Sequence, residues 1–419
     1  MFSERLGVRA DPKCGTEKPH KHEGEEEGEG EEERFPVGPV NPMGQVKTFI
    51  DAILASVNAT DGWVGPGTRP VLTNGKKGDG NIYWGRSNAM FSLMQYAEAE
   101  KKSTPAEYTK VATVMKNYFL CQKKMMVITP ITGWAAARWI DMALSVAWII
   151  DQPGIASAAE KAELLELGTL LHTQGSDWDQ WFMFSGKGGR GTGNAGGHNV
   201  NNAQALKSSA VWYLFSGNET MKQFGRDAMK NMDAHYGLPT GMFNGDEILP
   251  NPPTRNPSRG IETCGVVEAM FSYTTLGAVH GDVEYFDRAE KISFNAMPAA
   301  WASPRGGDMW AHPYLQAINE VNAIKADPHA WKADGPMSET YGLEPNYGCC
   351  TANFNQVSAM IITVQLSSLQ LMLYDCMDLS SVGLLFPPGL AEADQAGRDG
   401  DPGQRRCGDP PPSVHFHPC

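Results

Sequence analysis

The sequence predicts a mainly α-helical protein arranged as a ring of helical hairpins. Two observations lead to this fold class. About ten segments repeat apolar residues at the spacing of one helix face, and no convincing βαβ alternation of a parallel sheet accompanies them. Gly- and Pro-rich loops of very unequal length join these segments, as in helical toroids whose long loops gather at one end to build a site.

The predicted helices follow one another from residue 46 to residue 374. The first is marked by Val46, Phe49, Ile50 and Ile53, which recur at helical spacing before a Gly/Pro-rich turn at 61–70. A Pro-Gly pair at 153–154 ends a later helix. The predicted helical stripes are 46–57, 90–97, 111–120, 139–149, 158–172, 200–216, 220–235, 261–279, 282–297 and 351–374.

Composition and charge limit the classes of function. The chain has 419 residues, of which 41% are hydrophobic, enough to bury a large core. Its net charge of -13 includes eight glutamates between residues 23 and 33, which leaves about -5 for the rest. There is no basic stripe to neutralise phosphates and no apolar run near the roughly 18 residues of a membrane span. We therefore expect neither nucleic-acid nor membrane partners.

Both ends of the chain differ from the helical body. Residues 1–41 carry a dense glutamate block with few large apolar side chains, and residues 375–419 are rich in Pro, Gly and charge without a period. Such segments bury too little apolar surface to offset the entropy of ordering. We expect disordered segments at 1–41 and 375–419 around a catalytic-like domain at 42–374. The first residues lack the apolar run of a signal peptide, so the compartment is open.

A Gly-rich run, GKGGRGTGNAGG at 186–197, contains a literal G-x-G-x-x-G. A dinucleotide site would need a strand before it and a helix opening at the third glycine, within a βαβ unit. That context is missing, so we predict a flexible loop at the rim of a site. His198 follows directly, and two interpretations stay open: it caps a helix, or it contacts a substrate hydroxyl.

Two short motifs far apart in the chain carry metal-ligand chemistry. Glu262 and Cys264 form a Glu-x-Cys pair, and Cys349 and Cys350 are adjacent. Three thiolates and one carboxylate make four ligands, a set compatible with tetrahedral zinc. The alternative is that these are buried cysteines acting as small hydrophobic residues. Convergence of the four ligand atoms would favour the zinc interpretation.

Adjacent carboxylates precede the Glu-x-Cys pair in a Gly/Pro-rich loop. Asp246 and Glu247 lie about fifteen residues upstream, within MFNGDEILPNPPTRNPSRG. Acids in loops are often only solvated. A carboxylate folded back over a metal ligand could instead act as a general acid.

At these residues the chain resembles glycoside hydrolase family 127, the β-L-arabinofuranosidase-like six-hairpin glycosidases. The matching text is MFNGDE, RGIETCGVVEAMFSY, HGDVEYFDRAEKISFNAMPAAW and NYGCCTANFNQ, in the family's order. GRSNAMFSLMQYAEA, RWIDMALSVAWIID and GGHNVNNAQALKSSAVWYLFSGNE extend the likeness back to roughly Val46.

The resemblance implies an (α/α)6 barrel and a retaining glycosidase that removes β-L-arabinofuranosyl or related residues from a carbohydrate. Its implied zinc ligands are Glu262, Cys264, Cys349 and Cys350. Cys349 would also be the nucleophile, Glu247 the acid/base with Asp246 as the alternative, and His198 and Arg86 the sugar contacts. Arg86 stands where family members with known substrates tend to place histidine.

Two departures from the family keep other functions open. An acidic segment replaces the family's first helices, and nothing after about Leu373 matches its β-sandwich domains, so we expect an incomplete barrel. An inactive, truncated homologue could act as a zinc-stabilised scaffold that binds carbohydrate or a partner. A lyase or epimerase on the same fold would not need the four-ligand set.

Overall fold

The computed structural model describes residues 42–65, 69–72, 74–184, 192–256, 259–301, 311–317, 337–345 and 347–356. The segments predicted to be disordered, 1–41 and 375–419, lie outside these residues. The chain divides into two units, one ending at Ala55 and one beginning at Ser56. The first contributes a single described helix, α1 (Pro42–Ala55), in which Lys47 pairs with Asp51 one turn later at 2.7 Å.

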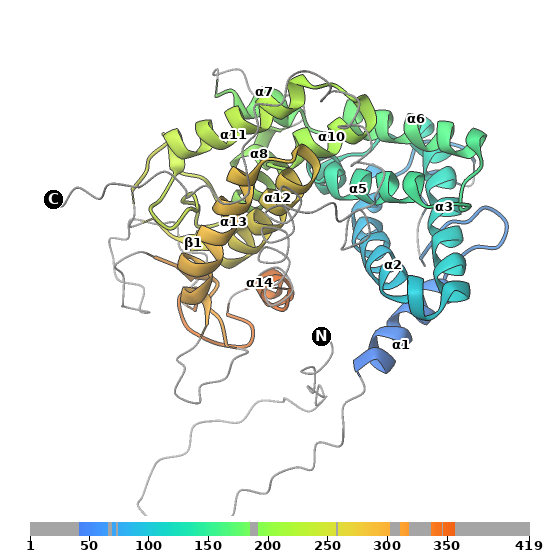
Figure 1. Cartoon of the computed structure of the whole chain (residues 1–419), viewed down its shortest axis with the longest axis horizontal. Coiled ribbons are helices and arrows are strands. Elements are labelled where there is room, and N and C mark those ends of the chain that lie inside the picture. The colour runs from blue at the N-terminus through green and yellow to red at the C-terminus, as the bar shows by residue number, and fades with distance from the viewer. Residues whose placement is uncertain are drawn as a thin grey trace, which may run out of the picture. The chain divides into compact units, whose positions relative to one another are not determined.

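The second unit begins with two helical hairpins (Figure 1). In the first, α2 (Tyr83–Ser103) packs against α3 (Pro105–Ile128); in the second, α5 (Trp139–Asp151) packs against α6 (Ala158–Gln174). Local signals set the helix starts, because Pro105 opens α3 and Ser157 forms a capping box with Glu160 at α6. Contacts of α2 with α5 and of α3 with α6 join the two hairpins.

Further hairpins follow in the same unit. Here α10 (Ser208–Ser216) packs against α11 (Thr220–Tyr236), and α12 (Thr263–His280) packs against α13 (Val283–Asn295). Helix α12 is the most buried of these, and α9 (Asn199–Ala205) contacts it. The short elements are η1 (Gly80–Ile82), α4 (Gly133–Ala137), α7 (Trp178–Phe182), α8 (Gly193–Gly197), β1 (Ile261–Glu262), η2 (Met297–Ala300), β2 (Leu315–Gln316) and α14 (Gly348–Phe354).

The described residues confirm the mainly α-helical prediction, with three local differences. The helix predicted at 200–216 is divided into α9 and α10 near Lys207, whose side chain is fully buried and pairs with Asp141 at 2.8 Å. The predicted loop at 186–197 ends in α8, where Asn201 and Asn202 donate side-chain hydrogen bonds to carbonyls of that turn. The helix predicted at 351–374 is α14 at its start, and residues from 357 on lie outside the described part.

Close approach of two helices fixes the position of the long loops. A Cβ atom at Gly265 on α12 would lie 2.3 Å from the Asn199 side chain on α9, so a glycine is required there. This approach brings the start of α9 next to the start of α12. Within the described residues, no helix has the length and apolar character needed to cross a membrane.

Candidate active site

A two-stranded sheet holds the first two candidate ligands at the start of α12. Strands β1 and β2 pair antiparallel, with Glu262 opposite Leu315. The backbone N–H of Thr263 donates to the carbonyl of Tyr314 at 2.9 Å. Glu262 is therefore the last residue of a paired strand and Cys264 lies in the first turn of α12, with both residues 1% exposed.

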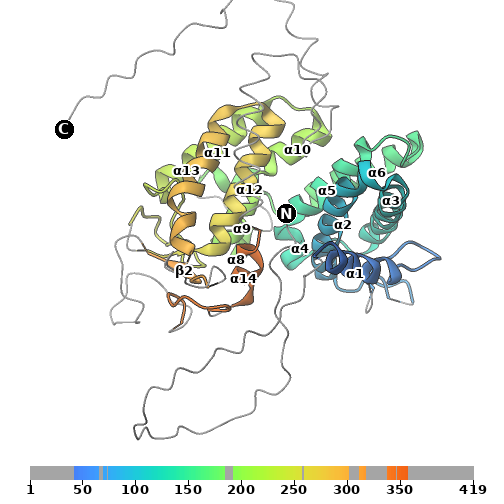
Figure 2. The same cartoon turned by 60° about the horizontal axis from the view of Figure 1, so that its bottom comes forward.

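Helix α14 brings the cysteine pair to the same place. Cys349 and Cys350 lie in its first turn, and α14 contacts α12 (Figure 2). His312 fixes α14 through a 3.1 Å contact between its Nε2 and the Thr351 hydroxyl. Cys350 is fully buried whereas Cys349 is exposed, so only Cys349 can be reached by a molecule from solvent.

The predicted convergence is confirmed. One ligand atom from each of Glu262, Cys264, Cys349 and Cys350 lies within 4.8 Å of every other. The sulfurs of Cys264 and Cys350 are 3.2 Å apart, and 86 residues separate them in the sequence. We call these four residues the cysteine cluster.

The surroundings shift the pKa values of the four cluster residues in opposite directions. Hydrogen bonds from Cys264 and then Cys350 lower the pKa of Cys349 to about 3, so its thiol is ionised at neutral pH. The same contact with Cys349 raises the pKa of Cys264, and burial raises that of Cys350. Burial, with the charges of Cys349 and Glu247, raises the pKa of Glu262.

The composition and burial of the cysteine cluster fit a bound metal ion. Its donor set of three sulfurs and one carboxylate is compatible with zinc. Glu262 Oε2 is buried and has no hydrogen-bond partner among the described residues. A cation would pair that oxygen and favour the ionised forms that burial now disfavours.

His198 links this region to the predicted acid. Its Nδ1 accepts a 3.4 Å hydrogen bond from the backbone N–H of Asn201, which caps α9, while its Nε2 lies 3.8 Å from Glu247 Oε1. Burial, and then the charge of Arg138, lowers the pKa of His198 to about 4. The ring is neutral near pH 7, and its Nε2–H faces the acid. The capping interpretation is correct, and a sugar contact through Nε2 stays a prediction.

The two adjacent carboxylates have different surroundings. Glu247 is partly exposed, with 26% of its side chain accessible, whereas the Asp246 side chain is fully buried and pairs with Arg259 at 2.7 Å. A buried carboxylate held by a guanidinium is poorly placed to reach a substrate. This geometry favours Glu247 as the acid.

Arg86, the second residue predicted to contact the sugar, makes several contacts within the protein. Arg86 donates to the carbonyls of Val64 and Ile82, and its Cζ lies 4.4 Å from the centre of the Trp63 ring. These contacts join the 56–65 segment to α2, and the predicted sugar contact of Arg86 stays a prediction.

Two aromatic residues near the site had no clear sequence signal. Trp134 meets His198 edge to face at 5.3 Å, and the buried Tyr314 lies among the charges of Glu262, Glu247 and Cys350. Both follow loops that the helical period does not predict. Only the approach of distant segments places them here.

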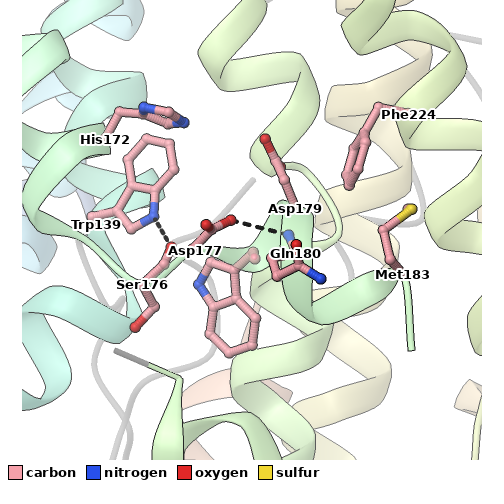
Figure 3. Close-up of a pocket in the computed structure, with 9 residues that line it drawn as sticks. Trp139, His172, Ser176, Asp177, Asp179, Gln180, Met183 and Phe224 are labelled. Atoms are coloured by element: carbon pink, nitrogen blue, oxygen red, sulfur yellow. Dashed lines mark hydrogen bonds between the residues drawn. The ribbon is translucent and has the colours of Figure 1, made fainter. Parts of the chain in front are cut away.

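A separate cavity lies beside α7 (Figure 3). Its volume is about 410 Å³, and none of its lining residues belongs to the cysteine cluster. Asp177 accepts a hydrogen bond from the backbone of Gln180, and burial, with the nearby charge of Asp177, raises the pKa of Asp179 to about 6. The lining residues are Trp139, His172, Ser176, Asp177, Trp178, Asp179, Gln180, Met183 and Phe224. We call this the α7 cavity.

Comparisons with known proteins give three findings. No curated protein matches the chain. A solved structure described as a glycoside hydrolase aligns with 15% identity and a TM-score of 0.48, over 78% of this chain and 51% of that one, so this chain spans about half of its length. The model of the β-L-arabinofuranosidase, GH127 catalytic domain matches residues 176–360, which include the whole cysteine cluster, His198 and Glu247. Residues 176–360 are therefore similar in sequence to the catalytic domain of glycoside hydrolase family 127.

Proposed function

We propose that this chain is a retaining glycoside hydrolase that uses Cys349 as its nucleophile and removes β-L-arabinofuranosyl or related residues from a carbohydrate. The observation that carries the proposal is the convergence of the exposed Cys349 with three buried ligand residues. Neighbouring thiols lower the pKa of Cys349, and the charge of Glu247 acts on Glu262 in the same cluster. The family match over 176–360 supports the glycosidase class. The sugar and the linkage are taken from the family resemblance.

In the first step, the Cys349 thiolate attacks the anomeric carbon and Glu247 donates its proton to the leaving oxygen. A carbon–sulfur bond forms while the bond from the anomeric carbon to the leaving oxygen breaks. In the second step, the Glu247 carboxylate takes a proton from water, the water oxygen bonds to the anomeric carbon, and Cys349 leaves as thiolate. Two inversions give retention, as in glycosidases with two carboxylates.

The residues around these two groups prepare them for their roles. In the metal-free chain, the Cys264 and Cys350 thiols donate hydrogen bonds that lower the pKa of Cys349, so no separate base is needed. Neutral His198 presents Nε2–H toward Glu247 and a sugar hydroxyl. A zinc ion held by Glu262, Cys264, Cys349 and Cys350 would take over this role from the hydrogen bonds, because it would keep all three thiols deprotonated at neutral pH.

The purified chain tests this function with a substrate and a metal analysis. We expect about one zinc per chain, release of p-nitrophenol from p-nitrophenyl β-L-arabinofuranoside, and the β-anomer as the first sugar product by proton NMR. Release of the α-anomer first would contradict the two-step mechanism. No hydrolysis of that substrate or of the corresponding furanosides and pyranosides would contradict the glycosidase.

A scaffold without catalysis is the second candidate. Cys264 and Cys350 pack in an apolar group with Val200, Tyr314 and Leu315, as purely structural cysteines would. Loss of stability upon metal removal, in a chain that hydrolyses none of these substrates with or without the metal, would favour the scaffold.

A further inference from the structure

Glu247 has a backbone conformation that non-glycine residues rarely adopt. Its φ angle is +90°, far from the regions favoured by L-amino acids. Such a conformation persists only where the surrounding structure holds it, and it occurs preferentially at functional sites. The contacts on each side of Glu247 therefore determine where its carboxyl group points.

Backbone hydrogen bonds fix the loop on both sides of this residue. The Glu247 carbonyl accepts from the Asn199 N–H at 2.7 Å, and the Leu249 N–H donates to the Gly197 carbonyl at 2.7 Å. On the other side, the Gly245 carbonyl accepts from the N–H of Glu262 at 3.1 Å. The loop therefore runs between the His198 segment and the strand that carries a cluster ligand.

The side chain of Asp246 adds a third attachment directly beside the strained residue. Its Oδ1 accepts from Arg259 Nη2 at 2.7 Å, and this carboxylate is fully buried while 16% of the Arg259 side chain is exposed. The next residue, Gly260, leaves room for it, because a Cβ there would lie 3.1 Å from the Asp246 Cβ. Charge-assisted hydrogen bonds of this kind are stronger than neutral ones and define geometry.

We propose that Asp246 and Arg259 are positioning residues that hold Glu247 in its strained conformation and aim its carboxyl group at the glycosidic oxygen. The inference rests on the proposed function, because it assigns the acid/base role to Glu247. Asp246 points to Arg259 and Glu247 remains partly exposed, so one loop uses its two adjacent acids differently. Without the ion pair, the backbone of Glu247 can relax to an ordinary φ, and its carboxyl group leaves the position required for proton transfer.

Asp246→Asn tests the inference because it keeps the side-chain shape and removes the charge. The matched control is Asp233→Asn, which breaks another aspartate–arginine pair, Asp233 with Arg288, between α11 and α13. Turnover is measured with an aryl arabinofuranoside that has a good leaving group, 2,4-dinitrophenol, and with one that has a poor leaving group, phenol. We expect Asp246→Asn to raise the ratio of the 2,4-dinitrophenyl rate to the phenyl rate at least tenfold. Asp233→Asn should leave this ratio unchanged.

The pH profile gives a second readout that loss of stability alone would not move. The basic limb of the rate with the phenyl substrate should shift in Asp246→Asn and remain in place in Asp233→Asn. Arg259→Lys retains the charge and loses the planar donor, so it should give an intermediate ratio. It also replaces Asp246→Asn if that variant does not fold.

The outcomes separate this inference from the proposed function. An unchanged ratio in Asp246→Asn and Arg259→Lys, with a raised ratio in Glu247→Gln, would overturn the positioning role and leave the function intact. If the wild-type chain hydrolyses none of the substrates, the function fails and a crystal structure of Asp246→Asn decides the positioning. A Glu247 φ still near +90° would then overturn it, and a relaxed φ would support it.

Discussion

The cysteine cluster and the α7 cavity both contain a carboxyl group whose pKa burial raises, Glu262 in the first and Asp179 in the second. They differ in what surrounds that group. Ligand atoms from two distant segments converge within 4.8 Å in the cluster, whereas the cavity offers about 410 Å³ of space with an aspartate that caps a short helix. Volume alone would thus select the α7 cavity, whereas convergence of potential ligand atoms selects the cysteine cluster.

The largest difference between the two regions should appear on substitution of the nucleophile. We expect Cys349→Ser to lower turnover by at least about a thousandfold for every leaving group, because it removes the attacking thiolate and a metal ligand together. The control is Cys121→Ser, since Cys121 is a free cysteine buried in α3 whose pKa burial raises to about 11. Its rate should stay near that of the wild type. Equal loss in both variants would indicate a general sensitivity to cysteine replacement.

Alkylation should distinguish the same two cysteines without any substrate. Cys349 is exposed and ionised, so iodoacetamide should modify it first in metal-free protein at pH 7, while Cys121 remains unmodified in the folded chain. Peptide mass spectrometry after short exposure measures the order. Earlier modification of Cys121 would contradict the assigned ionisation. Bound zinc should slow modification of Cys349.

Metal removal should affect the cysteine cluster and leave the α7 cavity unchanged. We expect chelation to lower the melting temperature by several degrees, because the buried carboxylate and thiols then lose their cation. Cys264→Ser should lose the bound metal, and Asp177→Asn in the cavity should retain it. Calorimetry with and without chelator, together with elemental analysis, measures both effects. Full metal content in Cys264→Ser would rule out the four-ligand site.

A smaller effect is expected for the acid, and it depends on the leaving group. Glu247→Gln should slow the phenyl substrate by about a hundredfold and the 2,4-dinitrophenyl substrate much less in the first step, because only the former needs protonation. Wild-type rates in Glu247→Gln, with lost activity in Asp246→Asn, would reverse the assignment of the two acids.

The helical fold was predictable from local sequence because its signals are local. Apolar spacing, Pro105 at a helix start and the Ser157–Glu160 capping box all act within a few residues. The break between α9 and α10 was not predicted; it falls at Lys207, whose buried side chain pairs with Asp141 of α5. Apolar periodicity predicts which face of a helix is buried, but it cannot predict a buried ion pair between residues of different helices.

The candidate site was predictable in its residue types and less so in its geometry. Glu-x-Cys and Cys-Cys are recognisable ligand motifs, but spacing alone could not bring together residues 86 apart. The different roles of Asp246 and Glu247 depend on Arg259 and on a positive φ, which arise from the path of one loop between two segments. The α7 cavity had no sequence signal, because its lining comes from α5, α6, α7 and α11.

The smallest effect should come from Asp179 in the α7 cavity, and it concerns stability. Its pKa is about 6 in the folded chain against an ordinary value of 3.8, so folding favours its protonated form. Its contribution to stability is therefore fully present below about pH 3.8, is lost as the pH rises to about 6, and stays constant above that. Asparagine cannot ionise, so Asp179→Asn should remove this loss of stability at higher pH.

We therefore expect Asp179→Asn to be more stable than the wild type at pH 7 by on the order of 1 to 3 kcal/mol, with a difference that shrinks toward pH 4. Thermal melts from pH 4 to pH 7.5 measure it, and Asp287→Asn, at an exposed position of α13, is the control for loss of one carboxylate. Turnover should be unchanged, because the cavity shares no residue with the cysteine cluster. A large loss of turnover in Asp179→Asn would join the two regions in one site and remove the contrast between them.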